Sequence, residues 1–182
     1  MQLITTGQPL RFVQIWPSAV TGEWVRREGS VGRTGRITET GLRPEAVDVH
    51  ELAAPYLAKG FVERDDEALA WVVMQFPLEN AAYDRRLIER ASEDVAAVLD
   101  ERGLGYVDGW DRGKRLSDGK IVSNVFARVV DGELGSVAAM AGLRLRGSDP
   151  RRATIAHRLP AQEDWTLRYE RSSHQLPGAF SL

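Results

Sequence analysis

Residues 28–39 read EGSVGRTGRITE, and this stretch decides how the first third of the chain is organised. It places three glycines at every third position between two segments, 23–27 and 36–40, that alternate as strands do. A hairpin needs only one short turn, with glycine where φ is positive. Three regularly spaced glycines predict instead a backbone that turns repeatedly or lies close to another group. A glycine-rich connection with no further role would show the same spacing.

The residues around this stretch predict a small antiparallel sheet with one helix. Residues 12–16 are aromatic and β-branched, which favours a strand. Pro44 marks where a helix would begin, because apolar side chains follow it at helical spacing, and Pro55 is expected to end or kink that helix. The charged run at 63–67 has the composition of a linker. We therefore predict a first domain over residues 1–66.

The sequence pattern changes after this domain, and strand-like and helix-like segments alternate over residues 67–170. Strands are predicted at 70–76, 105–110, 121–130, 153–159 and 166–169, and helices at 80–102 and 134–141. Up to 159 this order is the split βαβ, or ferredoxin-like βαββαβ, arrangement. The predicted fold class is thus α+β, with a ferredoxin-like domain after the small sheet. The tail at 171–182 has no periodicity and is expected to be loosely held.

Composition restricts the class of protein. The 182 residues are 43% hydrophobic and 27% charged, as in folded globular domains. The chain has no cysteine, which excludes disulfides and thiolate chemistry and fits a reducing compartment, so we expect a cytoplasmic protein. No signal peptide or membrane-spanning stretch is evident, and no membrane partner is expected. The net charge of −2 argues against a chain that mainly coats nucleic acid.

Three short segments of the first domain occur in the order and spacing of a known family. They are the strand at 12–16, the core Val31-Gly32-Arg33-Thr34-Gly35, and Lys59-Gly60-Phe61, where that family typically has Lys-Gly-Tyr. On these segments the domain resembles the WGR domain, which is found in DNA-dependent poly(ADP-ribose) polymerases and in many bacterial proteins. The resemblance implies that 28–39 is the family's signature turn. It also implies a role in a DNA-related system.

Val31 departs from the family, whose name comes from Trp-Gly-Arg. In the members that sense DNA breaks, that tryptophan contacts the broken end and the arginine supports contacts to DNA and to neighbouring domains. Val31 cannot stack as an indole does, and such stacking contributes about 1–3 kcal/mol per base. Gly32, Arg33 and Gly35 are retained. The resemblance therefore implies the turn more directly than the recognition of a DNA end.

Arginines are concentrated around the glycine-rich stretch. They outnumber the two glutamates there and make a basic patch on a mildly acidic chain. Arginine forks match phosphate oxygens, so this patch predicts contacts to nucleic acid. A solvated face, or ion pairs with the second domain, would explain the same residues. The residues of this hypothesis are Arg26, Arg27, Arg33, Arg36 and Arg43.

Asp108 and Asp111 are the carboxylates of the second domain that invite a metal or acid–base interpretation. Strand alternation places Asp108 with Tyr106 and Trp110 and sends Asp111 to the opposite side, so the two are not expected to converge on a cation. The three histidines are scattered, and neither a nucleophile elbow nor a phosphate-binding loop is present. We predict no catalytic residue, no metal and no cofactor. An enzyme with a site near these aspartates is the alternative.

The predicted ferredoxin-like sheet has one side against its helices and one side open. Alternation places aromatic and arginine side chains together on the open side, namely Trp71, Trp110, Phe126, Arg128 and Arg158. Sheets of this topology bind single-stranded RNA by stacking bases on such a surface. The same face could instead pack on the first domain or on a second copy of the chain.

Together these observations predict a non-enzymatic adaptor that works by binding. Nucleic acid, held through the arginine-rich loop, is one expected partner. A protein partner, including a second copy of the chain in a homodimer, is the other. Salt dependence separates the two, because phosphate contacts weaken steeply with added salt.

Overall fold

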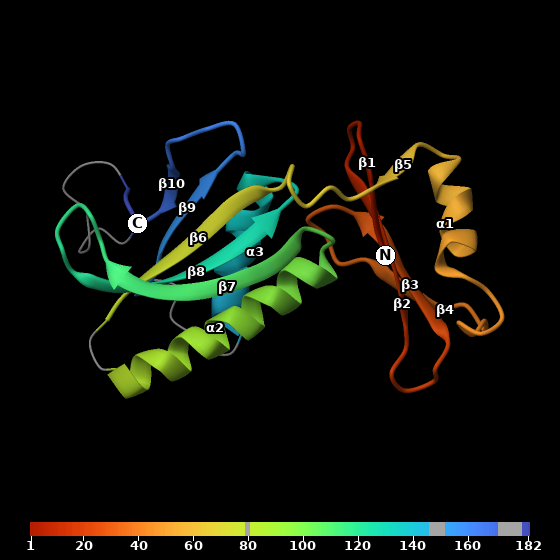
Figure 1. The fold of residues 1–182 in the computed structure, drawn as a ribbon, viewed down its shortest axis with the longest axis horizontal. Coiled ribbons are helices and arrows are strands. Elements are labelled where there is room, and N and C mark those ends of the chain that lie inside the picture. The colour runs from red at the N-terminus through yellow and green to blue at the C-terminus, as the bar shows by residue number, and fades with distance from the viewer. Residues whose placement is uncertain (79–80, 146–151, 171–179) are drawn as a thin grey trace. The chain divides into compact units, whose positions relative to one another are not determined.

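The computed structural model contains two antiparallel sheets and three helices, which confirms the predicted α+β class (Figure 1). It describes residues 1–78, 81–145, 152–170 and 180–182. The chain forms two compact units. The first unit comprises Met1–Asp65 together with Glu101–Gly103, and the second comprises Asp66–Asp100 and Leu104–Leu182.

The first unit contains a five-stranded antiparallel sheet and one helix, α1. The strand order is β4-β3-β2-β1-β5. The elements are β1 (Gln2–Thr5), β2 (Arg11–Pro17), β3 (Trp24–Ser30), β4 (Arg36–Glu39), α1 (Val49–Leu57) and β5 (Phe61–Glu63). The short strands β1 and β5 were not predicted from the sequence. β1 pairs with both β2 and β5, so the first strand and the last strand of residues 1–65 are neighbours in the sheet.

A small core lies between this sheet and α1. Val13 and Ile15 of β2 point to the same side by alternation and cluster with Leu3, Trp24 and Phe61. Ala53 is the fully buried residue of α1, and the helix packs against β2 and β5. This core holds the first unit together by the burial of apolar side chains.

The start predicted for α1 from Pro44 was wrong. The helix begins at Val49, because the carboxylate of Asp48 caps it by accepting a hydrogen bond of 2.7 Å from the His50 amide. Pro44 lies in the turn before this cap. Pro55 lies inside the helix, close enough to its C-terminal end that few backbone hydrogen bonds are affected.

The second unit contains the other sheet, with strand order β10-β9-β6-β8-β7, and two helices. Its elements are β6 (Ala70–Pro77), α2 (Ala81–Glu101), β7 (Gly105–Lys114), β8 (Ile121–Val129), α3 (Gly132–Leu145), β9 (Thr154–Arg158) and β10 (Thr166–Tyr169). Strand β7 is four residues longer than the prediction that ended at Trp110. All neighbouring strands in this sheet are antiparallel.

The two sides of this sheet are identified by their neighbours. A Cβ at Gly135 of α3 would lie 2.7 Å from the Val129 side chain, so the side of β8 that carries Val129 faces that helix. Val72, Met74 and Phe76 were predicted on the helix-facing side, and all three are buried. We call the other side the open face. By register it carries Trp71, Val73 and Gln75 of β6, Asn124, Phe126 and Arg128 of β8, and Ala156 and Arg158 of β9.

The end of the chain packs on the open face, so the loosely held tail was a wrong expectation for residues 180–182. Phe180 is only 9% exposed and clusters with Val73 and Ala156, with Phe126 packed against them. The Leu116 amide donates to the Leu182 carbonyl (3.1 Å), and the Ser117 amide donates to Ser181 Oγ (3.1 Å). Residues 171–179 lie outside the described residues.

Candidate ligand cavity on the open face

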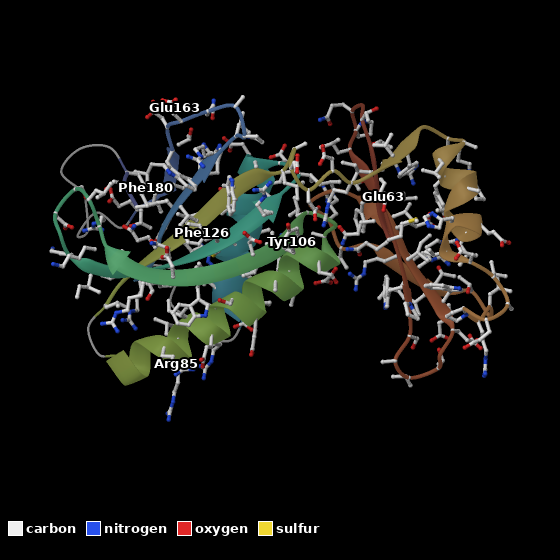
Figure 2. All side chains as sticks on the ribbon, in the orientation of Figure 1. Glu63, Arg85, Tyr106, Phe126, Glu163 and Phe180 are labelled. Carbon is white, nitrogen blue, oxygen red and sulfur yellow. The ribbon has the colours of Figure 1, made fainter. Side chains whose placement is uncertain are left out.

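A cavity of ≈ 270 Å³ lies on the open face of the second unit. Its lining comes from four strands, from the segment before β10 and from the chain end: Trp71, Asp108, Gly109, Trp110, Asp111, Phe126, Arg158, Trp165 and Leu182. Four of the five residues predicted for an interaction face border it, and the fifth, Arg128, contacts one of them. Phe126 and Phe180 mark this face among the side chains drawn in Figure 2.

Two stacks of similar composition build the aromatic part of this face. In one, the Arg128 guanidinium lies 4.3 Å from the centroid of Trp71, which meets Phe126 edge-on at 6.1 Å. In the other, Arg158 lies 5.0 Å from the centroid of Trp165, which meets Phe180 edge-on at 5.9 Å. Each stack thus joins a guanidinium, an indole and a phenyl ring, and cation–π attraction holds the arginines over the rings. Sequence alternation could not identify Trp165 or Phe180, since neither lies within a strand.

A β-bulge in β7 brings both aspartates to the cavity, contrary to the alternation predicted from the sequence. Val107 pairs with Ala127 and Gly109 with Phe126, so Asp108 is an extra residue on this strand. Beyond the bulge Asp111 pairs with Asn124 on the open face and accepts a hydrogen bond of 2.8 Å from its amide nitrogen. Gly109 has a φ of 150°, a backbone angle that residues with a side chain rarely adopt. The bulge therefore depends on a glycine at this position.

The bulge also changes the expectation for Trp110. Its partner across the ladder is Val125, on the helix-facing side, although Trp110 borders the cavity from the edge strand. The side chain is 45% exposed. Trp110 is therefore a rim residue of the cavity, whereas Trp71 and Phe126 pair with residues of the open face.

The cavity is lined by charges of opposite sign that are not paired with each other. Asp108 lies on the β7 wall and Arg158 comes from β9, and no hydrogen bond or ion pair joins them in the described part of the chain. The Nε of Arg158 is buried and has no hydrogen-bond partner there. Asp108, by contrast, is exposed to solvent and accepts no hydrogen bond from the residues that the structure describes. The cavity thus has a negative side and a positive side with aromatic rings between them.

A buried polar network supports the floor of the open face and reaches the acidic wall. Arg115, which is 6% exposed, donates from Nε to Asp118 (2.9 Å) and from a terminal nitrogen to Gln75 Oε1 (3.1 Å). Gln75 Nε2 in turn donates to Asn124 Oδ1 (3.0 Å) and to the Ser181 carbonyl (3.1 Å). Because Asn124 holds Asp111, the network positions that carboxylate and secures the chain end together. The hydrogen bond from Arg115 lowers the pKa of Asp118 to about 2.

The arginines predicted to contact nucleic acid differ in their partners and in their exposure. Arg26 lies 5.7 Å from the Tyr56 ring centroid and 3.6 Å from the Glu28 carboxylate. Its neighbour Arg27 points to the other side of β3, where it donates to Gln14 (3.0 Å) and stacks on Trp16 (5.1 Å). The remaining three, Arg33, Arg36 and Arg43, are exposed.

The residues predicted to form a signature turn show why the stretch at 28–39 carries so many glycines. Gly35 lies close to two side chains, since a Cβ there would come within 2.7 Å of both Phe12 and Arg27. Its amide donates to the Glu101 carbonyl (3.2 Å), and that of Gly32 donates to the Arg102 carbonyl (3.0 Å), both within the first unit. Val31 is only 7% exposed, so its side chain is buried.

The three histidines of the sequence lie at separate places in the chain. His50 is exposed on α1, His157 is buried on β9, and His174 lies outside the described residues. No group of three histidine, aspartate or glutamate side chains in the described part of the chain could hold a metal ion. None of the described helices has the length and apolar character needed to cross a membrane.

Comparison with known proteins gives no relative. No family model, no curated protein and no solved structure matches the chain.

Proposed function

We propose that this chain is a non-enzymatic binding protein that takes single-stranded nucleic acid on the open face of its second unit. The observation that carries the proposal is the pair of arginine–tryptophan stacks, Arg128 on Trp71 and Arg158 on Trp165, at one aromatic cavity. Unstacked bases bind to aromatic side chains and to guanidinium planes, and arginines also attract the phosphates between them. A duplex does not offer its base faces in this way.

The strand order supports the proposal of a ferredoxin-like second unit. Without β10, the order β9-β6-β8-β7 and the helices after β6 and β8 correspond to a βαββαβ chain, and β10 is then an added edge strand. Single-strand RNA-binding sheets of this topology use the side away from the helices, where the cavity lies. For the first unit we propose a WGR-like module, with five strands, one helix and Gly32-Arg33 in its turn.

Arg33 and Arg36 give the first unit a supporting role in this proposal. Both are exposed on the glycine-rich segment, where they are free to meet phosphates. Arg26 and Arg27 are already engaged by Tyr56, Glu28, Gln14 and Trp16. A homodimer formed through the open face is less favoured, since Phe180 and Leu182 of the same chain already cover part of it.

Trp165→Leu tests the proposal by removing one stacking platform from the cavity. We expect binding of a labelled single strand to weaken by about 1–3 kcal/mol, which is the contribution of one base–aromatic stack. Fluorescence anisotropy at low and moderate salt measures this loss, and binding should fall steeply with salt. Trp16→Leu is the matched control, because it removes an arginine–tryptophan stack of the first unit. Equal effects of the two variants, or no binding at low salt, would contradict the proposal.

A further inference from the structure

The unpaired charges of the cavity constrain what it binds. Asp108 and Arg158 line the same space, yet neither neutralises the other, and Nε of Arg158 is buried without a hydrogen-bond partner in the described residues. Because Nε is closed to solvent, a ligand meets this arginine through its terminal nitrogens, and a ligand that supplies acceptors to them suits the positive side of the cavity. Asp108 on the other side is exposed, so a ligand that supplies donors can meet this carboxylate in place of water. The middle of this ligand must be planar and apolar enough to lie among Trp71, Phe126 and Trp165.

We propose that this cavity is a guanine-binding site, in which the purine lies among the aromatic rings with one polar edge toward Arg158 and the neighbouring polar edge toward Asp108. This inference rests on the proposed binding of nucleic acid and names the base. The O6 and N7 acceptors of guanine match an arginine fork, which is assigned to Arg158. The adjacent N1–H and N2 amino donors match the two oxygens of a carboxylate, which is assigned to Asp108. Asp111 adds negative charge to the same wall while its orientation is fixed by Asn124.

The other bases fit the charge pattern less well. The Watson–Crick edges of adenine and cytosine place a ring-nitrogen acceptor beside the amino donor, and a carboxylate would repel that acceptor. Uracil has one donor between two acceptors on that edge. Guanine alone offers two adjacent donors on one edge and two adjacent acceptors on another, as the two walls of the cavity require.

The size of the cavity favours one base over a larger ligand. A volume of ≈ 270 Å³ is slightly below the range of pockets that enclose drug-sized molecules. The sugar and phosphate would therefore remain outside, where either a free nucleotide or a strand can continue. Guanosine monophosphate and a single-stranded oligonucleotide with one guanine distinguish these two sources of the same base.

The test compares calorimetric titrations of the full chain with the monophosphates of guanosine, inosine, adenosine, cytidine and uridine. We expect guanosine monophosphate to bind roughly 5- to 150-fold more tightly than adenosine monophosphate, as for one well-made bidentate contact. Inosine monophosphate lacks the N2 amino group and should fall between them. In Asp108→Asn the gap between guanosine and inosine should close, and in Arg158→Gln all binding of guanosine monophosphate should weaken.

Matched controls separate a site effect from a charge effect. Glu163→Gln and Arg112→Gln remove exposed charges of the same unit that do not line the cavity, and both variants should bind as the unaltered chain does. Glu163 is labelled in Figure 2. Melting temperatures of all four variants confirm that each is folded. Equal affinity for the five monophosphates, or equal effects of Asp108→Asn and Glu163→Gln, would overturn the guanine site.

Oligonucleotides separate this inference from the proposed function. Single strands of adenine with one central guanine are compared with strands that lack it. Salt-sensitive binding of both strands with equal affinity would overturn guanine selection and leave the proposed function standing. Binding of guanosine monophosphate without binding of either strand would support the guanine site and overturn the proposed function.

Discussion

At the scale of single residues, His157 has a charge state that the fold controls. Its ring lies next to the start of α3, where a Cβ at Gly132 would come within 2.7 Å of Cδ2. Burial lowers the pKa of His157 and outweighs the nearby Asp131, which raises it. Its Nδ1 has no hydrogen-bond partner in the described residues, so protonation in the folded state gains no compensating contact there.

This environment predicts a pH dependence of stability. Because the folded-state pKa of His157 is below its unfolded value, the unfolded chain binds the proton more readily. The neutral His157 contributes fully to the free energy of unfolding above about pH 6.5. This contribution is lost as the pH falls through the folded-state pKa of His157. Urea denaturation between pH 8 and pH 5 measures it, since the lowered pKa of Asp118, about 2, acts only at more acid pH.

The control for this prediction is the exposed histidine of α1. His50→Gln should keep the decline of unfolding free energy with acidification, whereas His157→Gln should show a flatter profile over the same range. Parallel profiles for the two variants would show that His157 is not the group responsible.

At the scale of elements, the start of α1 shows how a local cap determines a boundary. Asp48 satisfies an amide that the helix leaves unpaired, and this hydrogen bond of 2.7 Å places the start of the helix at Val49, five residues after Pro44. Glu51 lies three residues after Asp48, a spacing that favours a helix start. The information was therefore present in the sequence, although proline was the more conspicuous signal.

Asp48→Ala is expected to lower the free energy of unfolding of the first unit by about 1 kcal/mol. The loss arises because the His50 amide would have no side-chain acceptor. Urea denaturation followed by circular dichroism measures it, and Asp48→Asn should retain most of the stability because asparagine also caps helices. Equal losses in the two variants would show that charge, and not the cap, is responsible.

The open face contains residues that the sequence pattern placed correctly and residues that it could not place. Strand alternation located Trp71, Phe126 and Arg158 correctly, because β6, β8 and β9 are regular through these positions. It failed at Asp111, since one bulged residue in β7 changes the side of every residue that follows. Trp165 and Phe180 come from segments without periodicity, so only the folded chain shows that they complete the aromatic face.

At the scale of the whole molecule, the second unit depends on residues that are distant in the chain. The Gln75 side chain on β6 holds the Ser181 carbonyl, and Arg115, at the end of β7, holds Gln75. Phe180 fills the apolar space between Val73 and Ala156. Residues 180–182 are therefore part of the packing of this sheet. The open face depends on contacts between residues that are far apart in the sequence.

Phe180→Ala is expected to lower the free energy of unfolding by roughly 3 kcal/mol, as for other buried phenylalanines. The reason is the loss of contacts with Val73 and Ala156 and the cavity that remains. Guanidinium denaturation followed by tryptophan fluorescence reports the change, since Trp165 contacts Phe180. Leu116→Ala, at an 85% exposed position, should have almost no effect. If the two variants proved equally stable, the chain end would not belong to the core.

The bulge at Asp108 has a consequence for how this cavity can change by mutation. Every other residue of β7 has a partner on β8, so loss of the Asp108 codon would leave the rest of the ladder paired as before. Gly109 would still oppose Phe126, and Asp111 would still oppose Asn124. A single in-frame deletion would thus remove one carboxylate from the cavity and keep the sheet. Ligand preference and fold are separable at this codon, so lineages could gain or lose the acidic contact without rebuilding the protein.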